Sequence, residues 1–167
     1  LHRSVEAHVR RTGAQLTLHV ETGLRGTGGG IGNMAAGIDA DLVLLHNGDV
    51  ISSAGYGPAA AHHLESGALF TMILMRGASG PERFCPPPHV LADSSLSVTG
   101  FDATGRPTPP GARRFGYTGM SLISREGMSC FPRGEAYGLT GLLERLISER
   151  PGSVRGFVAG NAAWAET

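Results

Sequence analysis

Apolar and polar positions follow two different periods along this 167-residue chain. Apolar residues alternate with polar ones at residues 16–21, which predicts a half-buried strand. Leucines recur at helical spacing over residues 139–150 and stop at Pro151-Gly152, which predicts an amphipathic helix. Continuous apolar runs at residues 42–45 and 68–75 predict strands that are covered on both faces, as in a parallel sheet.

The other segments extend this alternation of helices and strands. Further helices are expected at residues 1–11, 31–38 and 58–67, further strands at 96–101, 115–123 and 154–159, and loops at 77–88 and 104–114. The pattern predicts an α/β fold of Rossmann-like type, with a mostly parallel sheet and helices on both faces. The chain length fits one domain with a real core, spanning residues 1–167.

Composition narrows the function classes. Lys plus Arg and Asp plus Glu both number 14, so no global basic field favours nucleic acid or an anionic membrane as a partner. Two cysteines do not make a disulfide framework, and no apolar run approaches the roughly 18 residues of a membrane span. With no signal peptide at the start, a cytoplasmic protein is expected. Both ends fall within patterned segments, so we expect a domain that is truncated at both ends.

A glycine run at residues 26–30 is the first candidate for chemistry. Without Cβ atoms its amides can approach a ring or a phosphate, and the helix expected after it offers a positive N-terminus. The alternative interpretation is a flexible turn from strand to helix.

Asp49 is the second candidate, because it follows the apolar strand at 42–45 through His46-Asn47-Gly48. Ligands bind at the carboxyl ends of strands in open α/β sheets, and Mg²⁺ prefers one or two carboxylates with phosphates and water. A turn Asp that caps the next helix is the alternative. Glu166, after Trp164, could complete a carboxylate pair, or it could be a surface residue beside a core tryptophan.

The histidines give weaker signals. His62 and His63 are adjacent on a predicted helix and point to different faces, so a solvated helix surface is expected there rather than a metal site. Cys85 and His89 flank three prolines without a recognised zinc spacing. No Ser/His/Asp order suggests a nucleophilic enzyme.

Taken in order, these segments resemble the sugar-nucleotidyltransferases, which make NDP-sugars from a sugar 1-phosphate and an NTP. Residues 21–31 are similar to the family's E-x-x-x-L-G-T-A/G-G-G-I segment beside the nucleotide base, and 42–50 to its strand ending in N-G-D. Residues 115–120 and the helix at 139–146 resemble its F-x-x-T-G-I-Y strand and following helix, which line the sugar pocket. Residues 164–167 resemble its W-x-D-I-G-T ending, with Glu166 in place of the usual Asp.

The resemblance implies roles for particular residues. Asp49 would bind Mg²⁺ as the catalytic centre, with Glu166 as second metal ligand. Gly26, Thr27 and Gly28 would contact the nucleotide, and Gly119 the sugar. The reaction would be an in-line attack of a sugar 1-phosphate oxygen on the α-phosphorus of UTP or GTP, displacing pyrophosphate. Nothing before Glu21 has the family's G-x-G-T-R-L-x-P-x-T triphosphate loop, so the chain alone is expected to be inactive.

Two other interpretations remain at this point. The chain could be a non-catalytic domain that binds a nucleotide-sugar and regulates a partner, or a generic α/β domain whose glycines are only turns. The identities of the base and the sugar are open, as is the formation of a homo-oligomer.

Overall fold

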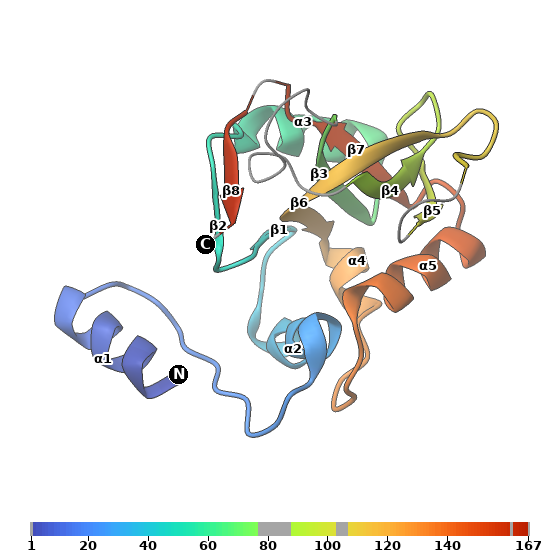
Figure 1. Ribbon diagram of the computed structural model, residues 1–167. Coiled ribbons are helices and arrows are strands. Elements are labelled where there is room, and N and C mark those ends of the chain that lie inside the picture. The colour runs from blue at the N-terminus through green and yellow to red at the C-terminus, as the bar shows by residue number, and fades with distance from the viewer. Residues whose placement is uncertain (1, 77–87, 103–106, 161, 167) are drawn as a thin grey trace.

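The computed structural model describes residues 2–76, 88–102, 107–160 and 162–166 (Figure 1). Its helices are α1 (His2–Thr12), α2 (Gly26–Met34), α3 (Tyr56–Ser66), α4 (Arg125–Ser129) and α5 (Leu139–Glu149), with a 3₁₀ turn at Ala35–Gly37. Its strands are β1 (Leu42–His46), β2 (Val50–Ser52), β3 (Phe70–Met75), β4 (Pro88–Ala92), β5 (Val98–Phe101), β6 (Arg113–Ser124), β7 (Val154–Val158) and β8 (Trp164–Glu166).

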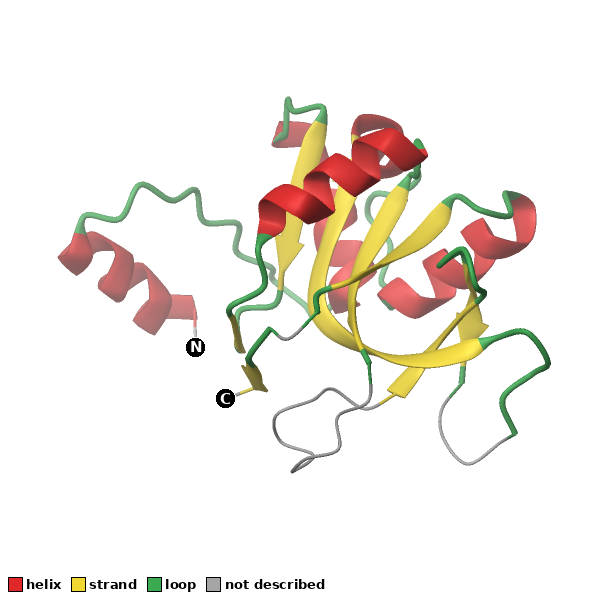
Figure 2. Cartoon of the chain, turned by 90° about the horizontal axis from the view of Figure 1, so that it is seen from above, coloured by secondary structure: helices red, strands yellow, loops and turns green. Residues whose placement is uncertain are grey.

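One six-stranded sheet forms the centre of the protein, in the order β5-β4-β6-β3-β7, with β1 also paired to β6. Figure 2 shows this twisted sheet with helices on both sides. The side chains of β3 alternate between the two faces: Met72 and Leu74 pack with the α5 leucines, whereas Ile73 packs with Ala59 of α3. The predicted α/β class with helices on both faces is therefore confirmed.

The direction of the strands differs from the prediction of a mostly parallel sheet. Among the described strands only β3 and β7 pair in parallel, and β6 is antiparallel to β1, β3 and β4. The strands β1, β3 and β7 do run in one direction, as expected for strands joined through helices. The long β6 lies between β1 and β3 and runs the opposite way, so most neighbouring pairs are antiparallel.

Several predicted elements are confirmed: α3, β3, β6, α5 and β7 occupy nearly the expected residues. The strand predicted at 16–21 is wrong, because these residues are exposed and have no regular structure. A strand needs a neighbour for its N–H and C=O groups, and no described strand pairs with this segment. The helix predicted at 31–38 begins earlier, at Gly26, so that the glycine run is helical. The predicted loop at 77–88 lies outside the described residues, except for Pro88.

The helix α1 stands apart from the rest of the chain in Figure 1, joined to α2 by an extended segment. It has no buried residue, although Val5 and Val9 give it an apolar stripe. No helix in the described part of the chain is long and apolar enough to cross a bilayer.

Candidate functional site

The strand β6 changes its partner at Gly119. Its residues 113–116 pair with β4, and residues 120–124 pair with β1. Two extra residues of β6 bulge out opposite Met72–Leu74. Gly119 has a φ of +79°, and a Cβ there would lie 2.9 Å from the side-chain nitrogen of Asn47. The Gly119 carbonyl accepts a hydrogen bond of 3.0 Å from the backbone N–H of Asn47. This position therefore favours glycine, and it holds the turn after β1 against β6.

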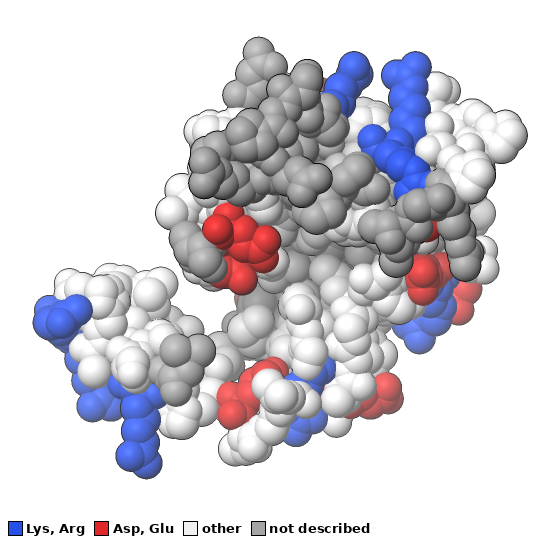
Figure 3. Space-filling view, in the orientation of Figure 1, with Lys and Arg blue, Asp and Glu red and all other residues white. Residues whose placement is uncertain are grey.

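The turn that begins at Asn47 carries Asp49 into β2, and β2 pairs only with β8 among the described strands. In this antiparallel pair Val50 lies opposite Glu166. Directly opposed residues in such pairs have Cα atoms roughly 4.5–5.5 Å apart, so Glu166 lies beside Val50, the residue that follows Asp49 in the chain. Both are exposed, and Figure 3 shows acidic atoms gathered on the side where β2 and β8 lie.

Trp164 anchors β8 to the main sheet. Its indole Nε1 donates a hydrogen bond of 2.9 Å to the carbonyl of Thr118, and the Thr118 hydroxyl donates one of 2.7 Å to the carbonyl of Ile73. Trp164 is 6% exposed and Thr118 is fully buried. The position of Glu166 is thus fixed through a buried chain of hydrogen bonds that begins next to Gly119.

A cavity of about 160 Å³ lies at this junction. Its walls come from β1–β2, β4, β6 and β8, and its lining residues are Asn47, Val50, His89, Tyr117, Gly119, Trp164 and Glu166. Burial raises the pKa of Tyr117 to about 12, opposed by the 2.8 Å hydrogen bond between its hydroxyl and that of Ser121. The phenol is therefore neutral at physiological pH. The structure thus brings Glu166 and Gly119, which the sequence named separately, to one cavity, whereas Asp49 is not one of the lining residues and only its neighbour Val50 is.

The carboxylate pair suits a hard cation in its chemistry. Within the described ranges no three His, Cys, Asp or Glu side chains gather as a metal-binding group. Mg²⁺ commonly takes only one or two carboxylates and completes its shell with substrate phosphates and water. Glu166 lines the cavity and Asp49 directly precedes β2, and these two exposed carboxylates are the residues that would hold the ion.

The glycine run makes close backbone contacts, but with the chain itself. A Cβ at Gly28 would lie 2.4 Å from the ring of Tyr137, and one at Gly29 would lie 2.4 Å from the carbonyl of Glu135. The amide of Gly29 also donates to the carbonyl of Tyr137 at 3.3 Å. These glycines allow α2 to pack against the segment before α5. Gly26 and Thr27 are exposed at the start of α2, and their contact with a nucleotide stays a prediction.

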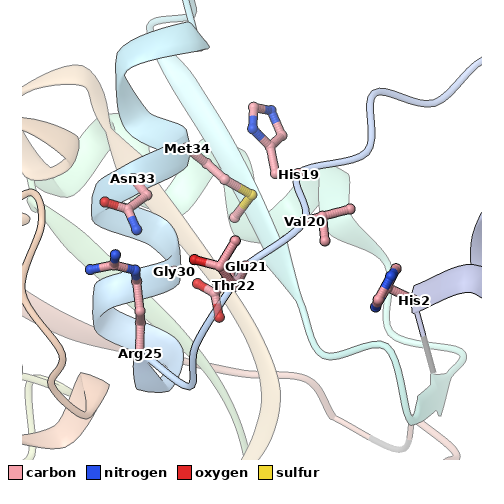
Figure 4. A pocket seen from close by; sticks show the side chains of 9 residues that line it. All are labelled: His2, His19, Val20, Glu21, Thr22, Arg25, Gly30, Asn33 and Met34. Carbon is pink, nitrogen blue, oxygen red and sulfur yellow. The ribbon is translucent and has the colours of Figure 1, made fainter.

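A second, larger cavity of about 530 Å³ lies beside the glycine run (Figure 4). It is lined by His2, His19, Val20, Glu21, Thr22, Arg25, Gly30, Asn33 and Met34. Arg25 also donates a 2.9 Å hydrogen bond to the carbonyl of Gly134. No lining residue is shared with the cavity at Gly119, so the surroundings of the glycine run and the predicted metal ligands belong to different parts of the described structure.

Sequence reasoning assigned no role to three side chains that line the smaller cavity, those of His89, Tyr117 and Trp164. In the sequence His89 stands out only as a neighbour of Cys85, which lies outside the described residues. Tyr117 and Trp164 fall within segments that resemble family motifs, but neither side chain is assigned a role in the site from sequence alone. The solvated surface expected at His62-His63 is wrong for His63, which is 1% exposed and bonded to the Thr71 hydroxyl at 2.7 Å.

The fold can be compared with solved structures, whereas no family model and no curated protein matches the sequence. HddC from Yersinia pseudotuberculosis complexed with GMP-PN has a TM-score of 0.75 and 16% identity, over 98% of this chain and 68% of that one. Another structure of HddC from Yersinia pseudotuberculosis gives 0.71 and 15%, over 98% and 67%. The inositol-1-phosphate CTP transferase from T. maritima gives 0.65 and 15%, over 98% and 64%.

The chain has a nucleotidyltransferase fold. This confirms the fold type expected from the ordered motifs. The chain spans about two thirds of the length of these structures. At this level of identity the likeness establishes the fold alone, and activity has to be argued from the site.

Proposed function

We propose that the protein transfers a nucleotidyl group from an NTP to a sugar 1-phosphate, releasing pyrophosphate in a Mg²⁺-dependent reaction. The observation that supports the proposal is the pairing of β2 with β8, because it sets Glu166, which lines the cavity that contains Gly119, opposite Val50, the residue that follows Asp49. Among the proteins of similar fold, one is complexed with GMP-PN and another is an inositol-1-phosphate CTP transferase. A uridylyl or guanylyl transfer is the type we favour.

The reaction needs orientation and charge neutralisation rather than a covalent nucleophile. An oxygen of the sugar 1-phosphate forms a bond to the α-phosphorus of the NTP, and the bond from that phosphorus to the β-phosphate oxygen breaks. Asp49 and Glu166 would hold Mg²⁺ through their carboxylates, and the ion would supply positive charge to neutralise the charge that develops on the phosphates. Gly119 would leave room for the acceptor. The exposed Gly26 and Thr27 at the start of α2 would contact the nucleotide, while Gly28 is buried against Tyr137.

The test is turnover by the complete protein, followed as pyrophosphate release with a panel of NTPs and sugar 1-phosphates. Asp49→Asn keeps the shape of the turn and removes one charge. We expect turnover to fall by about 10²-fold or more, the scale of losing one electrostatic contact to the transition state. Asp39→Asn is the matched control, because Asp39 is also an exposed aspartate but pairs with Arg125 away from this cavity.

Each result has a definite meaning. A fully active Asp49→Asn enzyme would refute the metal assignment. Binding of a nucleotide-sugar by the wild type without turnover would favour a regulatory domain instead. The thermal unfolding midpoint of the variant should stay close to that of the wild type, because Asp49 is exposed.

A further inference from the structure

His89 occupies an irregular position in β4. The pairing of β4 with β6 moves from Pro88 opposite Gly116 to Val90 opposite Phe115, which leaves His89 as one extra residue on β4. Its carbonyl accepts a hydrogen bond of 2.8 Å from the amide of Asp102. Bulges of this kind re-aim a side chain and occur frequently beside active sites. Here the bulge adjoins the cavity that His89 lines.

A second bulge, at Gly119 on β6, adjoins the same cavity. The two irregular positions belong to neighbouring strands, since β6 pairs with β4 immediately before the bulge at Gly119. Regular pairing of β4 with β6 would place His89 opposite a residue of β6. The geometry around the cavity thus departs from a regular sheet on two of its walls.

The walls of the cavity fit a hydroxylated ring rather than a phosphate. No Arg or Lys lines it among the described residues, and its one formally charged lining group is the carboxylate of Glu166. Asn47 and His89 offer hydrogen-bonding groups, while Val50, Tyr117 and Trp164 offer apolar surface. A sugar has the same mixture of hydroxyl groups and C–H faces. The volume of about 160 Å³ corresponds to roughly five water molecules at about 30 Å³ each, so it accommodates a small ring and not a whole nucleotide-sugar.

From these observations we propose that His89 selects the sugar: its imidazole makes a hydrogen bond to one ring hydroxyl of the acceptor, next to Gly119. This rests on the proposed function, and it assigns to one residue the discrimination between sugars. His89 is a specificity residue in this proposal and takes no part in the transfer of the nucleotidyl group. The phosphate of the acceptor lies outside the cavity, toward Asp49 and Glu166.

The kinetic test compares wild type, His89→Ala and His89→Gln in the complete protein, with His8→Ala as control. His8 lies on helix α1, which has no buried residue and contributes no lining residue to the cavity. Glucose 1-phosphate, mannose 1-phosphate and their monodeoxy analogues are the probes. For the preferred sugar we expect KM to rise about 3- to 10-fold in His89→Ala, the scale of one neutral hydrogen bond, with kcat and the KM for NTP unchanged. His89→Gln should recover part of the loss.

The deoxy analogues identify the contact. For one analogue, the one that lacks the hydroxyl bound by His89, the difference between wild type and His89→Ala should disappear. An equal penalty with every analogue, or a parallel rise in the KM for NTP, would overturn the proposal. Thermal unfolding of each variant shows whether a loss comes from misfolding, and His89→Gln then decides the result if His89→Ala fails to fold.

Binding without turnover separates this inference from the function on which it rests. The imidazole resonances of His89, assigned through His89→Gln, are followed by NMR while each sugar 1-phosphate is added in the absence of NTP. A shift at His89 in a protein with no transferase activity would support the sugar contact and refute the proposed function. Transferase activity with neither a shift nor a KM effect at His89 would refute the inference alone. The absence of both activity and shift would refute both.

Discussion

Replacing Gly119 by Ala tests whether the bulge in β6 builds the site. The substitution introduces two separate costs. At a φ of +79° an L-residue is strained, by about 1–2 kcal/mol. The new Cβ would lie 2.9 Å from the Asn47 side-chain nitrogen and 3.1 Å from a methyl group of Val50, and overpacking of this kind costs about 1–3 kcal/mol. We therefore expect a loss of about 2–5 kcal/mol in the free energy of unfolding.

Two other glycines separate these costs. Gly111 has a φ of +80°, and a Cβ there would have no atom within 4 Å, so Gly111→Ala should carry the backbone strain alone. Gly100, in β5, has neither a positive φ nor a close neighbour, and Gly100→Ala should be neutral or stabilising by about 0.5–1 kcal/mol. The expected order of stability is Gly100→Ala, then Gly111→Ala, then Gly119→Ala.

The assay is urea unfolding followed by circular dichroism, with thermal melting as a second measure. For a chain of this size about 1 kcal/mol shifts the midpoint by roughly 2–4 °C, so the three variants are distinguishable. Gly119→Ala should also weaken sugar 1-phosphate binding, because Asn47 and Val50 line the cavity and must move. If Gly119→Ala and Gly111→Ala lost equal stability and binding were unchanged, the close packing at Gly119 would not matter to the site.

Two further predictions concern the core. Leu143→Ala in α5 should lower the free energy of unfolding, measured in urea, by about 2–5 kcal/mol, because Leu143 is 1% exposed. The control Leu64→Ala should lower it far less, because Leu64 is 67% exposed. Equal losses would place Leu143 outside the core. Burial lowers the pKa of His63 from its usual 6.5, and the charge of neighbouring His62 lowers it further. As the pH drops below about 6.5, His63 therefore binds a proton more readily in the unfolded chain than in the folded one, and the free energy of unfolding falls. His63→Asn should reduce the fall in the thermal unfolding midpoint between pH 7.5 and 5.5, whereas the control His8→Asn should leave it unchanged. If the midpoint of His63→Asn fell as steeply as that of the wild type, His63 would not be the cause.

Local patterns are enough for much of the fold. The helix α5 and the strands β3 and β7 follow from leucine spacing and from short apolar runs, because burial of one helix face or of both strand faces leaves a direct trace in sequence. The residues Asp49, Glu166 and Gly119 follow from the order of motifs, and two of them, Glu166 and Gly119, line one cavity. Their chemical roles stay predictions.

The tertiary structure decided the rest, since it depends on partners that lie far apart in the chain. Residues 16–21 alternate like a strand, yet no described strand pairs with them, and alternation alone supplies no hydrogen-bond partner. The glycine run has the pattern of a turn that binds a ligand, but Tyr137 and Glu135 occupy the space that side chains at these positions would need. The bulge at His89 exists only through its pairing with β6. By itself the sequence determined which segments could be buried, and only the packing of distant segments determined which residues face the site.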